Sequence, residues 1–185
     1  MGKLIFVTGG ARSGKSTFAE KTIKKAGKDI IYIATAIAFD EEMEQRIALH
    51  KKQRPSNWYT IETYKNISGK VAAYKKHYDG VLLDCITIMV NNIMMDEIVN
   101  WDKISIEEAT LIEKKVTTEI KNLIDYIKKE NKTFVIVTNE VGSGIVPIYQ
   151  SSRLFRDVAG RANQMLAHAA DEAYLLVSSL PVKIK

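Results

Sequence analysis

The sequence predicts an α/β protein in which helices flank both faces of a mostly parallel β-sheet. Short apolar runs alternate with longer amphipathic stretches along the chain, as in folds built from strand–helix–strand units. The runs are apolar at successive positions, which is typical of strands buried on both faces. A glycine-rich motif joins the first run to the first amphipathic stretch, and it marks a strand–loop–helix unit. The length of 185 residues suits one hydrophobic core, so we expect a single domain over residues 1–185.

The expected strands are the short, β-branched apolar runs. In chain order they cover residues 4–8, 30–35, 81–84, 133–138 and 172–177. We expect a further short edge strand at residues 182–185, after Pro181, because proline is tolerated at the edge of a sheet. Ligands of parallel sheets bind at the carboxyl ends of the strands, so the residues that follow each strand are the first candidates for a site.

The expected helices are the amphipathic stretches between these strands. In chain order they cover residues 14–26, 40–53, 87–95, 105–130 and 151–170. The helix over residues 40–53 stops before Pro55, because the residue that precedes a proline avoids the helical conformation. Apolar residues three or four positions apart form one stripe along the longest helix. Residues 92–105 have weaker periodicity, which fits a loop or a subunit contact.

Composition and charge exclude several classes of protein. The single cysteine, Cys85, rules out an intrachain disulfide and a cysteine-based zinc cluster. No apolar run reaches the roughly 18 residues that a membrane span requires. The first strand leads straight into the glycine-rich motif, which leaves no room for a signal peptide, so we expect a cytoplasmic location. The net charge of +5 comes from scattered lysines rather than a basic tract, so we expect no nucleic-acid partner.

The glycine-rich motif is the strongest functional signal in the chain. Residues 9–16 read GGARSGKS and fit the phosphate-loop pattern GxxxxGK[ST] between a strand and a helix. Backbone N–H groups of such a loop, together with the helix N-terminus, attract phosphate. Lys15 is placed to reach the β- and γ-phosphates, and the Ser16 hydroxyl is placed to bind Mg²⁺.

A phosphate loop needs an acidic partner for the metal ion, and Asp84 is the candidate. It ends the apolar run Val81-Leu82-Leu83, as in the Walker B pattern. The alternative is that Asp84 caps the helix that begins near Thr87.

A second candidate is His50, on the expected helix over residues 40–53. Met43, Ile47 and His50 share one face, and Arg46 lies one helical turn away. The surrounding positive charge disfavours protonation of the imidazole and favours the approach of phosphate. A neutral imidazole can attack phosphorus and form a covalent phosphoramidate. By spacing alone, an ordinary surface histidine is the more frequent outcome, so the residues make His50 a candidate only.

These features lie within a longer set of matching segments. The set comprises residues 8–16, 32–36, Glu42-Met43, Arg46-Ile47, His50, Arg54-Pro55, Trp58, Thr60, Glu62, 83–87, 137–142, 144–147, Arg153, 155–157, Gly160-Arg161, Asn163-Gln164 and Ala170-Asp171. With these segments in order from end to end, the chain resembles the bifunctional adenosylcobinamide kinase / adenosylcobinamide-phosphate guanylyltransferase family. The strand that ends in Asn-Glu-Val-Gly and the arginine-rich helix after it make the resemblance far more specific than a phosphate loop alone.

The resemblance implies two reactions in the assembly of the nucleotide loop of adenosylcobalamin. In the first, ATP or GTP phosphorylates the aminopropanol hydroxyl of adenosylcobinamide. In the second, GTP transfers GMP to that phosphate through a guanylylated histidine and releases pyrophosphate. His50 stands at the position of that histidine. The resemblance also implies a RecA-like sheet and a homotrimer.

The resemblance extends the candidate site beyond the phosphate loop, with Mg²⁺ as cofactor. Catalytic roles fall on His50 and Lys15, and metal binding on Ser16 and Asp84. Nucleotide contacts fall on Gly9, Gly10, Ala11, Arg12, Ser13, Gly14, Lys15, Ser16, Ala34, Thr35, Ala36, Lys51, Lys52, Gln53, Arg54, Glu62 and Asp84. Some relatives have Glu at the position of Asp84, which keeps the charge with a longer reach.

Other residues have two interpretations each. Asn139 and Glu140 follow a strand, and they either cap a loop or position the substrate hydroxyl or a metal-bound water. Arg153, Arg156 and Arg161 fit either an ion-pair network, with Asp157 paired to Arg153, or a phosphate or corrinoid site. Trp58 and Tyr59 either pack in the core or stack on a base or on the corrin edge.

Two rival functions remain from the residues alone. One is a phosphate-loop kinase of small molecules that forms no covalent enzyme intermediate. The other is a RecA-like module driven by nucleotide hydrolysis, for which the sequence offers no basic stripe.

Overall fold

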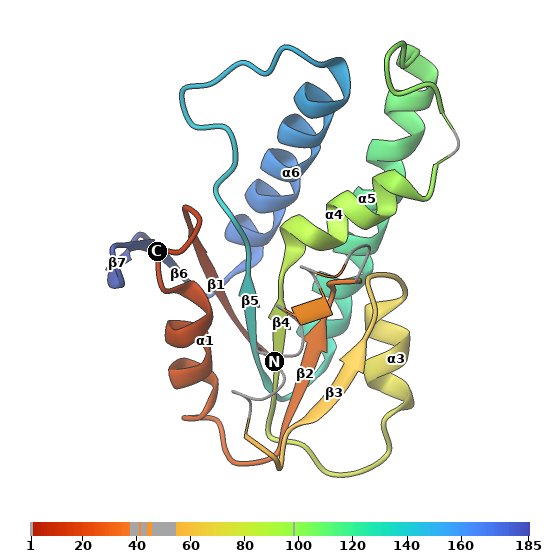
Figure 1. The fold of residues 1–185 in the computed structure, drawn as a ribbon. Helices are drawn as coiled ribbons and strands as arrows, with labels where there is room; N and C mark the ends of the chain where they lie inside the picture. The colour runs from red at the N-terminus through yellow and green to blue at the C-terminus, as the bar shows by residue number, and fades with distance from the viewer. Residues whose placement is uncertain (1, 38–40, 42–43, 46–54, 98) are drawn as a thin grey trace.

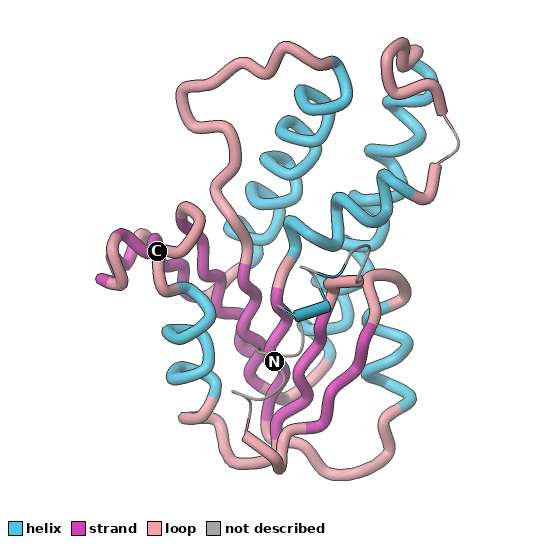
Figure 2. Tube along the Cα trace, in the orientation of Figure 1, coloured by secondary structure: helices cyan, strands magenta, loops and turns pink. Residues whose placement is uncertain are grey.

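The chain folds around one seven-stranded sheet, which Figures 1 and 2 show from one side. The computed structural model describes residues 2–37, 41, 44–45, 55–97 and 99–185. The strands are β1 (Lys3–Gly9), β2 (Ile30–Ala34), β3 (Tyr59–Glu62), β4 (Gly80–Asp84), β5 (Thr133–Val137), β6 (Glu172–Val177) and β7 (Leu180–Lys183). Their order across the sheet is β3-β2-β4-β5-β1-β6-β7, and every neighbouring pair is parallel except β6 and β7. The mostly parallel α/β fold is therefore confirmed.

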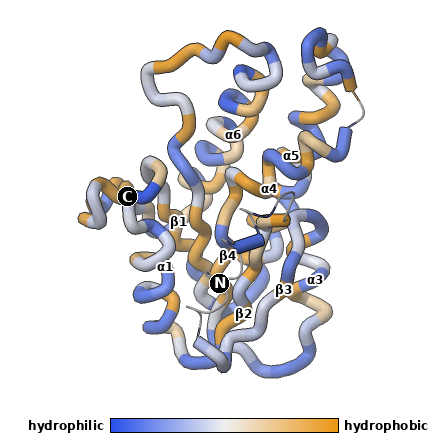
Figure 3. Tube along the Cα trace, viewed as in Figure 1, coloured by the Kyte–Doolittle hydropathy of each residue, from blue (hydrophilic) through white to orange (hydrophobic). Residues whose placement is uncertain are grey.

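Helices cover both faces of this sheet. They are α1 (Lys15–Ile23), α3 (Ile67–Ala73), α4 (Ile86–Met95), α5 (Ile106–Lys129) and α6 (Gln150–Ala169). Alternate residues of β1 point to opposite faces: Leu4 and Phe6 join the core under α3 to α6, whereas Ile5 and Val7 join the core under α1. Burial on both faces explains why the central strands are apolar at successive positions, and they are largely orange in Figure 3.

Two elements were not expected from the sequence. Strand β3 has exposed residues at both ends, and its composition lacks the apolar run that marks the central strands. Helix α3 has only seven residues and buries only Ile67 and Val71, too few to produce a clear helical period. Both elements lie at the β3 side of the sheet (Figure 1), where one-sided burial weakens the sequence signal.

The remaining boundaries are close to those expected, with one correction. The C-terminal strand was expected to begin after Pro181, but β7 begins at Leu180 and includes the proline. Pro181 is tolerated there because β7 is the last strand of the sheet, so its missing N–H can face away from β6. Of the helix expected over residues 40–53, only Glu41, Glu44 and Gln45 are described, and they are helical. No helix within the described ranges combines the length and the hydropathy needed to cross a membrane.

At the amino edge of the sheet, Asp79 holds the turn that leads into β2. One carboxylate oxygen accepts hydrogen bonds from the backbone N–H groups of Lys28 and Asp29, at 2.8 and 2.9 Å. The other oxygen lies 2.9 Å from Nε2 of His77. Gly27 has φ of 155°, and a Cβ there would lie 2.0 Å from the Asp79 carboxylate, so the turn needs glycine.

Candidate active site at the carboxyl edge of the sheet

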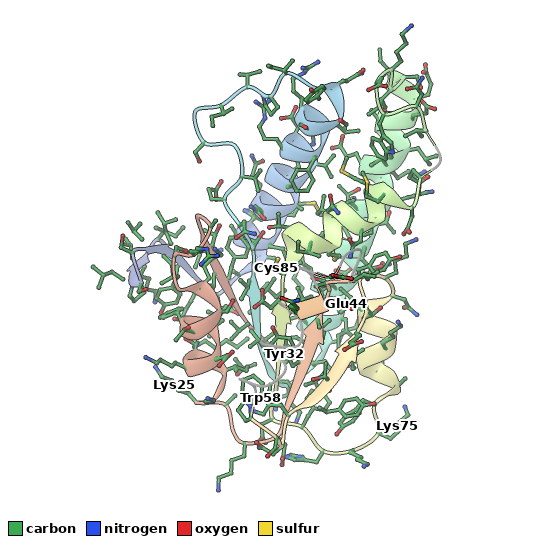
Figure 4. All side chains as sticks on the ribbon, viewed as in Figure 1. Lys25, Tyr32, Glu44, Trp58, Lys75 and Cys85 are labelled. Carbon is green, nitrogen blue, oxygen red and sulfur yellow. The ribbon has the colours of Figure 1, made fainter. Side chains whose placement is uncertain are left out.

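The carboxyl ends of β1, β2, β4 and β5 meet at one edge of the sheet, and α1 and α4 begin there (Figure 1). Helices α4, α5 and α6 project beyond this edge (Figures 1 and 2). In Figure 4, Cys85 lies at this edge, Tyr32 lies midway along the strands and Trp58 lies near their opposite end. The polar residues that follow the strands are therefore brought together, as parallel-sheet topology requires.

The phosphate loop between β1 and α1 is held by close backbone contacts. Gly9 has φ of 151°, and a Cβ there would lie 2.5 Å from the carbonyl oxygen of Leu176 in β6. Gly14, the N-cap of α1, has φ of 89°, and a Cβ there would lie 2.7 Å from the Ser179 hydroxyl. Both positions need glycine for conformation and for space. The two motif glycines thus let β6 and the turn after it close on the loop.

The turn between β6 and β7 supports the phosphate loop directly. The backbone N–H of Ser179 donates to the carbonyl of Ser13 at 2.9 Å. Ser178 and Ser179 both have positive φ, at 49° and 69°, as a two-residue hairpin turn demands. This contact was missed from the sequence, because nothing near residue 178 resembles a known motif and the residues it joins are far apart in the chain.

Lys15 directs its ammonium group back over the phosphate loop. Its Nζ donates to the carbonyl of Gly10 at 2.6 Å, and only 8% of the residue is exposed. Burial lowers the pKa of Lys15, while the nearby Cys85 and Asp84 oppose that change. A positive charge is therefore held inside a loop of backbone N–H groups at a helix N-terminus, an arrangement that binds phosphate.

Asp84 and Ser16 form the second half of the site. The Ser16 hydroxyl donates to the Asp84 carboxylate at 2.8 Å, and the Tyr32 hydroxyl donates to the same oxygen at 3.2 Å. The N-cap of α4 is Cys85, and the Asp84 side chain faces α1 rather than the first turn of α4. The capping interpretation of Asp84 is therefore wrong. A hydroxyl and a half-buried carboxylate in contact provide hard oxygen ligands, which fit a divalent cation such as Mg²⁺.

The candidate residues of β2 and β3 lie at the same edge. Ala34 is paired with Asp84 on one side and with Glu62 on the other. The hydroxyl of Thr35, which is 1% exposed, donates to the carbonyl of Cys85 and accepts from its N–H, both at 2.8 Å. The Thr35 side chain therefore joins the end of β2 to the end of β4. Its hydroxyl is occupied by these two hydrogen bonds. Any nucleotide contact at 34–36 would come from the backbone or from Ala36.

Glu140 follows β5, the strand that lies between β1, which leads into the phosphate loop, and β4, which ends in Asp84. Its backbone N–H donates to the carbonyl of Gly9 at 3.0 Å, and its carboxylate accepts from the hydroxyl of Thr8 at 3.1 Å. The sequence placed Glu140 after a strand and therefore at this edge. It did not reveal Thr8 as the partner, because strand order decides which residue meets the end of β5.

The arginines of α6 contact the loop before the helix and neighbouring carboxylates. Arg153 donates to the carbonyls of Pro147 and Ile148, and Arg156 donates to the carbonyl of Ile145. Arg161 pairs with Glu113 of α5. The expected pair of Arg153 and Asp157 is wrong: Asp157 pairs with Arg156 instead, because Arg153 reaches back to the loop before α6. These arginines fix the loop that carries Glu140 and tie α6 to α5.

The aromatic candidates lie away from this edge. Trp58 is buried and stacks on Tyr32 with a centroid distance of 6.3 Å, near the amino end of β3 (Figure 4). Tyr59 packs against Tyr74 at 4.5 Å. Core packing therefore explains the Trp58 ring, whereas the Tyr59 ring lies against Tyr74 and is half exposed. His50, Lys51, Lys52, Gln53 and Arg54 lie outside the described residues.

Solved structures of other proteins share this fold. The chain superposes on a Pyrococcus horikoshii OT3 protein, the subject of a structural study of project PH0250, with a TM-score of 0.54 and 10% identity. That match covers 99% of this chain and 86% of the other. The RadB recombinase matches with a TM-score of 0.50 and 14% identity, over 94% of this chain and 73% of the other. These likenesses show a RecA-like fold.

Curated relatives match over nearly the whole chain. The bifunctional adenosylcobalamin biosynthesis protein CobU of Salmonella typhimurium is 44% identical over 98% of this chain and 99% of its own length. The protein of the same name from Escherichia coli is 42% identical with the same coverage. The bifunctional adenosylcobalamin biosynthesis protein CobP of Pseudomonas aeruginosa is 30% identical over 97% of this chain and 95% of its own length.

The family model described as cobinamide kinase / cobinamide phosphate guanyltransferase matches residues 5–184, which include the phosphate loop, Asp84 and Glu140. The chain therefore belongs to the cobinamide kinase / cobinamide phosphate guanyltransferase family.

Proposed function

We propose that this protein is a bifunctional adenosylcobinamide kinase and adenosylcobinamide-phosphate guanylyltransferase. It phosphorylates adenosylcobinamide with a nucleoside triphosphate, then transfers GMP from GTP to give adenosylcobinamide-GDP and pyrophosphate. The observation that carries the proposal is an intact phosphate loop in contact with Asp84, within a chain of this family. The names of the relatives support the place of both reactions in adenosylcobalamin biosynthesis.

The first part of the proposed site binds the triphosphate. The backbone of residues 9–16 and the Lys15 ammonium surround the phosphates, and the contact between Ser16 and Asp84 marks where Mg²⁺ would be held. When bound, the ion neutralises charge on the phosphate oxygens. Lys15 adds a positive charge that desolvation makes more effective, since its side chain is buried.

The second part of the proposed site supplies the nucleophile for guanylyl transfer. His50 attacks the α-phosphorus of GTP through a neutral ring nitrogen, and the bond to pyrophosphate breaks. The phosphate of the acceptor then attacks the same phosphorus and releases His50. The assignment of His50, and of nucleotide contacts at Lys51, Lys52, Gln53, Arg54, Glu62 and residues 34–36, rests on family resemblance.

Intact-protein mass spectrometry tests the function. The native chain is incubated with GTP and Mg²⁺, alongside His50→Ala and the control His168→Ala, whose histidine is exposed near the end of α6. We expect an acid-labile GMP adduct on the native chain and on His168→Ala, and none on His50→Ala. Adding adenosylcobinamide with ATP or GTP tests the kinase step by the appearance of adenosylcobinamide phosphate. Phosphorylation without any adduct would support the plain kinase instead.

The same proposal includes a homotrimer in the cytoplasm. The family resemblance supports the trimer, and exposed apolar residues of β7 and its flanks offer contact surface, among them Leu180, Val182 and Ile184. Light scattering coupled to size exclusion gives the mass in solution. A mass of one chain at micromolar concentration would contradict the trimer.

A further inference from the structure

Two acidic residues contact the two ends of the phosphate loop, Asp84 through its carboxylate and Glu140 through its backbone. Asp84 accepts from Ser16, the last residue of the loop, at 2.8 Å. Glu140 bonds to the first residue, Gly9, through its backbone N–H at 3.0 Å. Lys15 bonds to the next carbonyl, that of Gly10. The Glu140 backbone N–H and the Lys15 ammonium therefore bind successive carbonyls, which places the Glu140 backbone beside the end of the loop where Lys15 would reach the terminal phosphates.

The strand order places Glu140 between the two halves of the site. Strand β5 pairs with β1 on one side and with β4 on the other, and Val137 is level with both Val7 and Asp84. Glu140 comes three residues after Val137, so it extends beyond the level of Asp84, out of the sheet edge. Glu140 therefore follows the strand that lies between the phosphate loop and Asp84.

The backbone just before Glu140 is fixed by buried side chains. The N–H of Asn139 donates to the Thr87 hydroxyl at 2.7 Å, and the Asn163 amide donates to the carbonyl of Asn139 at 3.2 Å. The Thr138 hydroxyl donates to the other end of the Asn163 amide at 2.8 Å. Thr87, Thr138 and Asn163 are all less than 9% exposed. Side chains of α4 and α6 thus hold the two peptide groups on either side of Asn139, which preorganises the backbone that carries the Glu140 carboxylate.

The Glu140 side chain itself remains open to solvent. Its carboxylate accepts from Thr8, and within the described ranges no cation pairs with it. Because an unprotonated carboxylate has more acceptor sites than the Thr8 hydroxyl uses, it can accept a further hydrogen bond from a hydroxyl group. The cation-binding oxygens of Ser16 and Asp84 lie at the other end of the loop, so Glu140 is not needed as a metal ligand.

We propose that Glu140 is the general base for the acceptor hydroxyl in the phosphoryl-transfer step, oriented by the Thr8 hydroxyl. The inference rests on the kinase half of the function proposed above. The acceptor oxygen forms a bond to the γ-phosphorus, and the bond from that phosphorus to the β–γ bridging oxygen breaks. The nucleoside diphosphate leaves with the electron pair. The hydroxyl proton moves to the Glu140 carboxylate and from there to water.

The two half-reactions of the protein separate this role from a structural one. Formation of the enzyme–GMP adduct from GTP uses no acceptor hydroxyl, so it does not need Glu140. Glu140→Gln is therefore expected to lower kcat for phosphorylation of adenosylcobinamide by about 10²- to 10⁴-fold, the usual contribution of a general base. The affinity for GTP and the rate of adduct formation are expected to remain native.

The experiment compares Glu140→Gln, Glu140→Asp and the control Glu107→Gln, whose carboxylate is exposed on the first turn of α5. Each variant is assayed for phosphorylation across pH, for GTP affinity and for adduct formation. Glu140→Asp keeps a carboxylate and should retain part of the activity and the native acidic limb of the pH profile. The pH profile of Glu140→Gln should lack the acidic limb, and Glu107→Gln should behave as the native chain.

Three results would overturn the inference. A native phosphorylation rate in Glu140→Gln would show that Glu140 is not the general base. If Glu140→Gln loses phosphorylation, adduct formation and GTP affinity to the same extent, the role of Glu140 is only to support the structure of the phosphate loop. If Glu140→Gln does not fold, Glu140→Asp decides by the same readouts. A native chain that forms the GMP adduct but never phosphorylates adenosylcobinamide would refute the kinase half of the proposed function, and the inference with it.

Discussion

Strand β4 has an aspartate at each end, and the two are held in different ways. Asp79 precedes the strand at the amino edge, where its oxygens are taken by two backbone N–H groups and by His77. Asp84 ends the strand at the carboxyl edge, where its partners are the hydroxyls of Ser16 and Tyr32. Backbone donors cannot turn away without unfolding the turn, whereas hydroxyls can rotate and present their lone pairs to a cation.

This difference separates a structural carboxylate from the carboxylate that we propose as a metal ligand. Asp29, His77 and Asp79 bring ligand atoms within 4.8 Å of one another and so resemble a metal cluster. The hydrogen bonds of Asp79 explain that cluster as a clamp on the turn at Gly27. Backbone hydrogen bonds from the turn also lower the pKa of Asp79, which keeps it charged and bound. Proximity of acidic groups is therefore a weaker indication of function than the kind of donor that holds them.

Among the substitutions that compare the two ends of β4, the largest expected effect comes from Asp84→Asn. Loss of the charge removes the proposed hard ligand of Mg²⁺ and should lower kcat for both reactions on the order of 10²- to 10³-fold, the range for removing one charge-stabilising group. Stability should change little, because an amide oxygen can still accept from Ser16 and Tyr32. Steady-state assays of both half-reactions check this, with Asp79→Asn as the matched control. Equal loss of activity in Asp84→Asn and Asp79→Asn would contradict the distinction between the two aspartates.

Truncation of Asp79, the aspartate at the amino edge, is expected to lower stability and to leave activity unchanged. Asp79→Ala leaves the N–H groups of Lys28 and Asp29 without their partner and should lower the free energy of unfolding by about 1–3 kcal/mol. Activity of the folded fraction should stay native. Urea titration measures the stability change, and an Asp84→Ala variant provides the comparison. A stable Asp79→Ala protein with impaired catalysis would assign a functional role to the amino edge.

Glu172 extends the comparison to a second carboxylate at the amino edge. It begins β6, and the ion pair with Lys3, together with the Tyr174 hydroxyl, lowers its pKa from the ordinary 4.5 to about 2. A depressed pKa stabilises the fold above pH 4.5, and this contribution is lost as the pH falls from about 4.5 towards 2. Because the pair is partly exposed, the contribution should not exceed about 1 kcal/mol.

Glu172→Gln should therefore lower stability at pH 7 and leave it nearly native below pH 2. Thermal unfolding across pH, compared with Glu107→Gln, measures the difference between the two proteins. A constant destabilisation at every pH would show that packing rather than charge explains the effect.

The smallest expected effect concerns Cys85, which follows Asp84 directly. Burial, with a further contribution from Asp84, raises the pKa of the thiol to about 12. The thiol therefore stays protonated and unreactive at pH 8. A chromogenic disulfide reagent should modify the native protein only as fast as it unfolds, whereas the urea-unfolded chain should react at once. Rapid modification of the folded chain would show that this edge opens around Asp84.

How much the sequence predicts depends on how local each feature is. The phosphate loop and the buried central strands follow from contiguous residues, so motif and hydrophobic pattern were sufficient. Strand β3 and helix α3 lie at the edge of the fold with few buried residues, which weakens both patterns. The contact of Thr8 with Glu140 joins residues 132 positions apart, and that of Ser13 with Ser179 depends on β6 lying beside β1. Such pairs require the strand order, which no local pattern encodes.

The most direct test of the site is the Mg²⁺ dependence of GTP binding, measured by calorimetry. The native chain and Asp79→Asn should bind GTP more tightly with Mg²⁺ than with EDTA, because in the proposed site Ser16 and Asp84, which lie in contact, share the ion with the phosphates. Asp84→Asn should bind GTP through the phosphate loop yet gain little from Mg²⁺. Full Mg²⁺ enhancement in Asp84→Asn would contradict the assignment of Asp84 as the ligand carboxylate, and loss of enhancement in Asp79→Asn would contradict the separation of the two edges.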